Sequence, residues 1–165
     1  RDYALAWQNR GAALFNLRQY KDAIASYTES LLINPDDRAV IDARERAIAN
    51  CQGRIDVSFF IETSEEIENE LDVCFEDIYA ELKCVRQNEE YHLKILGELF
   101  LKSGGKKLEN DIEIVVAVYN KENKLTGHER IGIRKERGCY FYPFEMHLDL
   151  IYIPAKIRVH PIKMW

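Results

Sequence analysis

The segment spanning residues 6–35 carries small and aromatic side chains at intervals that suit two closely packed helices. It divides into Ala6–Asn16 and Arg18–Pro35, and in each part apolar residues recur at the spacing of one helix face. Gly11 and Ala23 are small enough to let two helix backbones approach each other. The sequence therefore predicts a helical hairpin, and the remainder of the chain has to be arranged around it.

The hairpin segment resembles the tetratricopeptide repeat (TPR), a helix–turn–helix unit of about 34 residues. The residues that carry the resemblance are Trp7, Gly11, Leu14, Tyr20, Ala23, Tyr27, Ser30 and Pro35. Pro35 also ends the second predicted helix, because the residue before a proline is driven away from helical geometry. The alternative is an ordinary helical hairpin inside another all-α fold.

Arrays of this repeat bind peptides or partner proteins in a groove lined by their first helices, and the resemblance implies the same here. The groove-facing positions that match are Gln8, Ala12, Phe15 and Asn16. A clamp for chaperone tails needs an asparagine directly after the glycine, whereas Ala12 follows Gly11 here. The resemblance therefore implies a protein or peptide partner, without that particular specificity.

A third helix is predicted from Asp37 to Gln52, because a shift by the repeat period of about 34 residues superimposes apolar positions. We expect Asp42, Arg44 and Arg46 to make its outer side polar. This helix resembles the solvating helix that closes a TPR array, since terminal repeats present a polar outer face.

The first three residues, Arg1–Tyr3, align with the turn between two repeats, so we expect a preceding repeat upstream. A single repeat cannot bury its own apolar face. Leu5 and Ala12 belong to that face, and an exposed apolar patch marks an interface. We therefore expect either packing against the rest of the chain or a homodimer formed through the TPR helices.

Residues 54–77 are rich in acidic side chains, and no basic residue occurs between Glu62 and the end of this stretch. Charge runs of this kind are usually solvated. The sequence predicts an acidic linker here, with a helical turn capped near Ser64, between a helical domain at 1–53 and a β domain at 78–165. An acidic strap that docks on a basic surface is the alternative.

From residue 78 onward apolar and polar residues alternate with a period of two, which is typical of strands. The predicted strands are residues 79–85, 91–101, 112–118, 124–134, 140–148 and 156–163. Polar turns are expected at 86–90 and 120–123, and a flexible loop at 103–107. Several short strands with no helices between them predict an antiparallel sandwich, so the fold class is α+β with two domains.

The β region also resembles the small immunoglobulin-like bacterial domains of the FxLYD family. The residues that carry this resemblance are Ile112–Tyr119, the turn to Gly127, and the run Pro143, Phe144 and Glu145. The resemblance implies an immunoglobulin-like β-sandwich in a bacterial protein, and it implies no activity.

The amino-acid composition and net charge argue against some classes of binding partner. Hydrophobic residues make up 47% of the 165 residues, which is enough for a packed core. The net charge is -5 and the isoelectric point is near 5.5, which argues against a general nucleic-acid binder. No apolar run approaches the ~20 residues that span a bilayer, and the first residues lack the shape of a signal peptide. We expect a cytoplasmic protein, with export left open because the sequence does not begin with methionine.

No catalytic or metal-binding motif is present in the sequence. The four cysteines, Cys51, Cys74, Cys84 and Cys139, form no CxxC pair, so neither a metal nor a cofactor is expected. They are expected to be reduced and mostly buried, unless export permits a disulfide between sheet cysteines. The four histidines, His92, His128, His147 and His160, are scattered over different predicted strands.

Two polar groupings were considered as sites. Glu145, His147 and Asp149 share one face of a predicted strand, which could gather acid–base groups or form a solvated face, and the solvated face fits the whole strand better. A candidate basic patch comprises Lys121, Lys124, Arg130, Arg134, Lys135 and Arg137. Interleaved acidic residues argue against reading single-stranded nucleic acid there.

The sequence thus favours a non-enzymatic interaction or scaffold module whose TPR binds a protein or peptide. The alternatives are an assembly role as a homo-oligomer, and an accessory ligand-binding β-sandwich for which the TPR is a spacer or oligomerisation element. No nucleic acid or membrane is expected among its partners.

Overall fold

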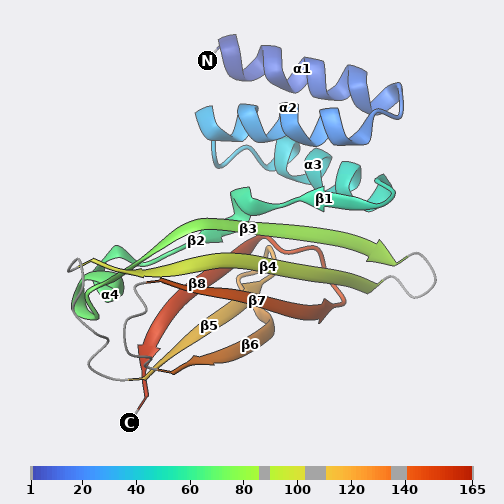
Figure 1. The fold of residues 1–165 in the computed structure, drawn as a ribbon. Helices are drawn as coiled ribbons and strands as arrows, with labels where there is room; N and C mark the ends of the chain where they lie inside the picture. Colours follow the sequence, from blue (N-terminus) through green and yellow to red (C-terminus); the bar gives the residue numbers. More distant parts are fainter. Residues whose placement is uncertain (1, 86–89, 103–110, 135–140, 165) are drawn as a thin grey trace. The chain divides into compact units, whose positions relative to one another are not determined.

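The computed structural model describes residues 2–85, 90–102, 111–134 and 141–164 (Figure 1). The chain divides into two compact units, Arg1–Ile55 and Asp56–Trp165. Among the described residues, the first unit holds three helices and the start of one strand, and the second unit holds the remaining strands, so the α+β class predicted from the sequence is confirmed.

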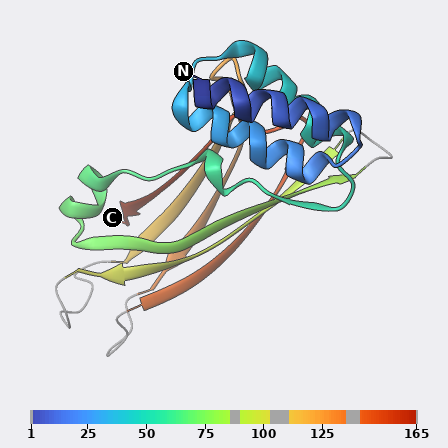
Figure 2. The same cartoon turned by 90° about the horizontal axis from the view of Figure 1, so that it is seen from above.

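The first unit is a row of three helices: α1 (Asp2–Asn16), α2 (Tyr20–Ile33) and α3 (Arg38–Asn50). Figures 1 and 2 show α1 and α2 side by side, as the predicted hairpin requires. The α3 helix begins at Asp37, whose carboxylate accepts hydrogen bonds from the backbone N–H groups of Ala39 and Val40 at 3.1 and 3.3 Å. Such a cap satisfies donors that the first helical turn leaves unpaired.

Two details of this unit differ from the sequence prediction. The α1 helix already includes Asp2 and Tyr3, so these two residues do not form the expected turn between repeats. Arg44 is half-buried, because it shares a face of α3 with the buried residues Val40, Ala47 and Ile48. Burial lowers the pKa of the Arg44 guanidinium to about 10. Of the three residues expected on the polar outer side of α3, Asp42 and Arg46 are exposed and Arg44 is not.

The described strands form two four-stranded sheets, which belong to the second unit except for Arg54 and Ile55 of β1. The first sheet has the order β1 (Arg54–Asp56), β3 (Val73–Val85), β4 (Glu90–Leu101) and β7 (Phe141–Leu150). The second sheet has the order β2 (Ile61–Glu62), β8 (Lys156–Lys163), β5 (Ile112–Tyr119) and β6 (Leu125–Ile133). Figure 1 shows the two sheets as separate layers.

The core of this unit lies between the inner faces of the sheets. In β7 every second residue from Tyr142 to Leu150 is buried and the residues between them are exposed, which is the predicted period of two. Inner residues of β5 and β8 such as Ile114 and Ile157 are wholly buried. A Cβ added at Gly127 on β6 would fall 2.8 Å from Cδ2 of Leu150 on β7, so the sheets approach closely there.

The stretch predicted as an acidic linker, residues 54–77, contains ordered elements. It forms β1, a 3₁₀ turn at Ser58–Phe60, β2, the short helix α4 (Glu65–Glu70) and the first residues of β3. The β2 strand pairs with β8 in parallel, so the second sheet is not wholly antiparallel as predicted. Residues 54–77 include Val57, Phe60 and Val73, which are buried. Their burial explains why this stretch is not a solvated linker.

The β3 strand begins five residues before the predicted start of the β domain. Its pairing with β4 shifts register between Glu76 and Tyr79, and Asp77 has a positive φ of 49°. This irregularity, which includes the acidic residues Glu76 and Asp77, interrupts the alternation of apolar and polar residues. The first half of the strand was therefore not predicted from the sequence. The predicted loop at 103–107 lies outside the described residues, as do residues 86–89 of the predicted turn at 86–90.

Candidate functional site

The helical hairpin is held together by the residues that set its sequence spacing. Tyr27 of α2 is 4% exposed and lies against Gly11 of α1, where a Cβ would fall 2.6 Å from Cε1 of the ring. The hydroxyl of Ser30 donates a hydrogen bond of 2.9 Å to the backbone carbonyl of Ala4. Small and hydroxyl side chains thus fix the separation of α1 and α2.

The predicted groove positions all lie on α1, but they do not behave alike. Ala12 and Asn16 are exposed, while Gln8 and Phe15 are half-buried. The Phe15 ring packs edge-on against Tyr20 with ring centroids 5.4 Å apart, so it supports the hairpin turn. The exposed pair, one helical turn apart, is the part of this set that remains available to a partner.

Exposed apolar residues accompany this pair on the helices of the first unit. Leu5 of α1 is 55% exposed, Leu17 in the turn after α1 is 68% exposed, and Leu32 of α2 is 70% exposed. Arg10 lies over the Trp7 ring, with its guanidinium carbon 5.1 Å from the centroid, which is a cation–π contact. The α1 surface therefore combines apolar, amide and aromatic groups.

The candidate basic patch is not gathered at one place. Lys121 and Lys124 lie at the turn between β5 and β6, Arg130 lies within β6, and Arg134 directly follows that strand. Arg130 is 3.5 Å from a carboxylate oxygen of Glu113. Lys135 and Arg137 lie outside the described residues. The described cations thus follow the length of one hairpin.

The outer face of the first sheet carries a network of exposed ionisable groups. His92 pairs with Asp149 across β4 and β7. Glu145 accepts from Lys94 at 2.7 Å and from His147 at 2.8 Å, and these two hydrogen bonds lower the pKa of its carboxyl group. The interpretation of residues 145, 147 and 149 as a solvent-facing row agrees with their exposure.

The cysteines are distributed between the units. Cys51 is buried, Cys74 and Cys84 are half-buried, and no disulfide joins these three described residues to one another. Burial and the nearby Glu76 carboxylate raise the pKa of the Cys74 thiol. Cys139 lies outside the described residues.

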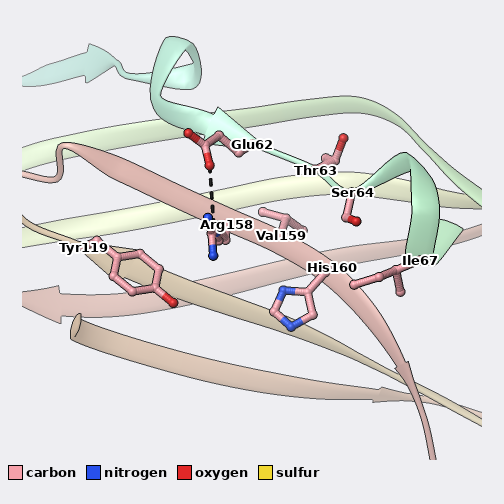
Figure 3. Close-up of a pocket in the computed structure, with 8 residues that line it drawn as sticks. All are labelled: Glu62, Thr63, Ser64, Ile67, Tyr119, Arg158, Val159 and His160. Carbon is pink, nitrogen blue, oxygen red and sulfur yellow. Dashed lines mark hydrogen bonds and ion pairs between the residues drawn. The ribbon is translucent and has the colours of Figure 1, made fainter. Parts of the chain in front are cut away.

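A pocket with a volume of ≈ 420 Å³ opens on the outer face of the second sheet (Figure 3). One side is formed by β8 and the end of β5, and the other side is formed by β2 and the segment leading into α4. The lining residues are Glu62, Thr63, Ser64, Ile67, Tyr119, Arg158, Val159 and His160.

The strand register explains why this face is hollow. On β8 the inner residues Ile157 and Val159 are buried, so Arg158 and His160 point outward. On the neighbouring strand, Ala117 stands opposite Arg158 and Val115 stands opposite His160. These small side chains leave room above the sheet between longer neighbours.

Arg158 is positioned by contacts on two sides. Its Nε atom donates to Glu62 on β2 at 3.4 Å, and its guanidinium carbon lies 5.7 Å from the centre of the Tyr119 ring. Lys156 lies 3.8 Å from the other oxygen of Glu62. Figure 3 shows the Tyr119 hydroxyl directed toward the part of the pocket where Arg158 and His160 lie.

His160 has an unusual electrostatic environment. Partial burial lowers the pKa of its imidazole, and the positive charges of Arg158 and Arg130 lower it further. The neutral imidazole is therefore favoured near neutral pH. The positive charges of Arg158 and Arg130 therefore both lie close to this side of the pocket.

The sequence did not reveal this pocket. Thr63, Ser64 and Ile67 fall in the stretch predicted as a linker, and His160 was placed only on a predicted strand, apart from the other histidines. The signal that was available is the alternation of Arg158 and His160 with buried neighbours on β8. Nothing local indicated that β2 would pair with that strand.

No helix in the described part of the chain is long and apolar enough to cross a membrane. A comparison with curated proteins gave no match. A comparison with family models matched residues 4–37 to the tetratricopeptide repeat, which covers α1, α2 and the turn after them. The helical hairpin at the start of this chain is a tetratricopeptide repeat.

Proposed function

We propose that this protein is a non-enzymatic interaction module whose TPR hairpin binds a protein or peptide through α1. TPR repeats generally mediate protein–protein interaction, and residues 4–37 match that repeat. The observation that carries the proposal is the exposure of Ala12 and Asn16 on α1 beside the exposed Leu5. The same proposal places the protein in the cytoplasm, where its cysteines would stay reduced.

A peptide library displayed against the full chain tests this proposal. Selected peptides are measured by calorimetry against the wild type, Ala12→Arg and the control Ala25→Arg, which alters an exposed alanine on α2. We expect Ala12→Arg to weaken binding by about tenfold or more, because a bulky charge in the groove has to be desolvated. Equal losses in the two variants, or binding unaffected by Ala12→Arg, would contradict the proposal.

The exposed leucines favour self-association as a second candidate function. Leu5 on α1 and Leu17 directly after α1 are 55% and 68% exposed, and exposed apolar side chains of this size gather at interfaces. A homodimer through the TPR helices would bury them. Light scattering of the full chain should then give a dimer mass that falls to the monomer value in Leu5→Glu/Leu17→Glu.

Leu32→Glu provides the matched control, because Leu32 is 70% exposed on α2. This control variant should remain dimeric if α1 forms the interface. A wild-type monomer mass that does not change up to high concentration would exclude the homodimer.

A further inference from the structure

The pocket on the second sheet is lined mostly by hydrogen-bond donors that lack protein partners. Within the described part of the chain, the two terminal nitrogens of Arg158 make no hydrogen bond. The same holds there for the hydroxyls of Thr63, Ser64 and Tyr119. The one carboxylate in the lining, Glu62, is already engaged by Arg158 Nε and Lys156. A complementary ligand therefore has to supply acceptors.

The charges around the pocket favour an anion. Arg158, Lys156 and Arg130 contribute three positive charges, whereas Glu62 and Glu113 contribute two negative charges. The guanidinium of Arg158 is held from one side by Glu62, so its outer edge stays presented for a planar pair of oxygens. Positive charge and unpaired donors thus coincide at one position.

The size and remaining lining of the pocket favour an organic ligand over a bare inorganic ion. Its volume of ≈ 420 Å³ falls within the roughly 300–1,000 Å³ range of small-molecule sites. Ile67 provides apolar surface, and the Tyr119 ring provides an aromatic face. An inorganic oxyanion would leave these groups uncovered.

We propose that this pocket binds a small organic anion, in which a carboxylate or phosphate group is held by Arg158 and Tyr119 and an apolar group packs on Ile67. The hydroxyls of Thr63 and Ser64 complete the donor set from the segment before α4. This binding site goes beyond the proposed TPR function and depends on different residues.

Binding is tested with the full chain and four probes: N-acetylphenylalanine, its neutral amide, phenyl phosphate and inorganic phosphate. Chemical-shift changes in ¹H–¹⁵N spectra give both the affinity and the location. We expect at least one of the two organic anions to bind at the pocket. That anion should bind about tenfold or more tightly than the amide, since one charge-assisted contact carries that difference. The two anions together distinguish a carboxylate from a phosphate ester.

The imidazole of His160 supplies a second readout. A bound anion favours the protonated ring, so its NMR titration should shift to higher pH when the tighter organic probe is present. The charged groups that act on it are Arg158 on its own strand and Arg130 on β6, which are paired with the carboxylates of Glu62 and Glu113 respectively. An unshifted titration at saturating probe would count against a ligand beside this ring.

Substitutions locate the contacts. Arg158→Gln should weaken the organic anion about tenfold or more, while Arg134→Gln, the same charge change on an exposed residue outside the pocket, should leave affinity unchanged. Tyr119→Phe removes only a hydroxyl and should weaken binding even if Arg158→Gln fails to fold. Ile67→Ser should weaken the organic probes and not inorganic phosphate.

Four results would overturn the proposal. They are the amide binding as tightly as the tighter of the two organic anions, equal losses in Arg158→Gln and Arg134→Gln, inorganic phosphate binding as tightly as both organic anions, and no shift change at the pocket with any probe.

Discussion

A Cβ placed on Gly11 would fall 2.6 Å from Cε1 of Tyr27, which is closer than two non-bonded carbon atoms approach. The glycine of α1 and the tyrosine of α2 therefore set the separation of the two helices as a pair. Tyr27 is 4% exposed, so its ring cannot move out into solvent to make room for a larger side chain. This contact gives a physical reason for a glycine within a helix, where glycine otherwise weakens the structure.

Replacing Gly11 with leucine should overpack the hairpin and reduce its free energy of unfolding by about 1–3 kcal/mol. Urea denaturation followed by the helical circular dichroism signal measures the change. Gly132→Leu is the control, because a Cβ there would meet only the Met164 sulfur at 3.9 Å. If Gly11→Leu and Gly132→Leu unfold at the wild-type urea concentration, the close approach of the helices is not an important constraint.

The boundary between the two units can be tested with fragments. We expect residues 56–165 to fold alone, because this unit contains both sheets, apart from Arg54 and Ile55 of β1, and most of their core. A fragment of residues 78–165, which matches the domain predicted from sequence, lacks β2, α4 and the start of β3 with its buried Val73. The longer fragment should give a dispersed amide NMR spectrum and the shorter one should unfold at lower temperature. Equal melting temperatures would restore the linker interpretation.

The tight turn between β5 and β6 depends on one side chain. The Oδ1 atom of Asn120 accepts hydrogen bonds from the backbone N–H groups of Glu122 and Lys124 at 3.1 and 2.9 Å. Asn120→Ala removes both bonds and should cost about 1–2 kcal/mol in unfolding free energy. Asn120→Asp retains an acceptor oxygen and should cost less. Equal destabilisation by both substitutions would show that the amide nitrogen, and not the oxygen, is what the turn requires.

The elements that the sequence predicted well are those whose signals are local. The spacing of Gly11 and Tyr27 indicated the hairpin, and the alternation from Tyr142 to Leu150 indicated β7, because each pattern is read along one element. The tight turn was recognisable from Asn120 and its neighbours for the same reason. The immunoglobulin-like assignment of the sheets remains a prediction.

The elements that were missed depend on pairings between distant residues. Glu62 pairs with Arg158, and no local pattern connects β2 with the last strand of the second sheet. The pocket similarly depends on Ala117 standing opposite Arg158, which is a consequence of strand register. An acidic composition suggested solvent exposure for α4, although Glu68 is only 6% exposed. Charge alone was therefore a poor guide to burial in this stretch.

The lowered pKa of His160 predicts how the stability of the β unit changes with pH. Burial, Arg158 and Arg130 lower this pKa below its ordinary value of 6.5, which the unfolded chain recovers. As the pH falls through 6.5, the unfolded state takes up a proton before the folded state does. Protonation therefore favours unfolding, and the free energy of unfolding should decrease on acidification.

Urea unfolding of the wild type and of His160→Gln at pH 8 and pH 5 measures this contribution. The variant should lose less stability than the wild type between the two pH values, because its amide binds no proton. His128→Gln is the matched comparison, since it removes an exposed histidine whose residue stands opposite Ala117 on the same outer face. If the wild type and His160→Gln lose the same stability on acidification, the imidazole of His160 is not held in its neutral form by the charges around the pocket.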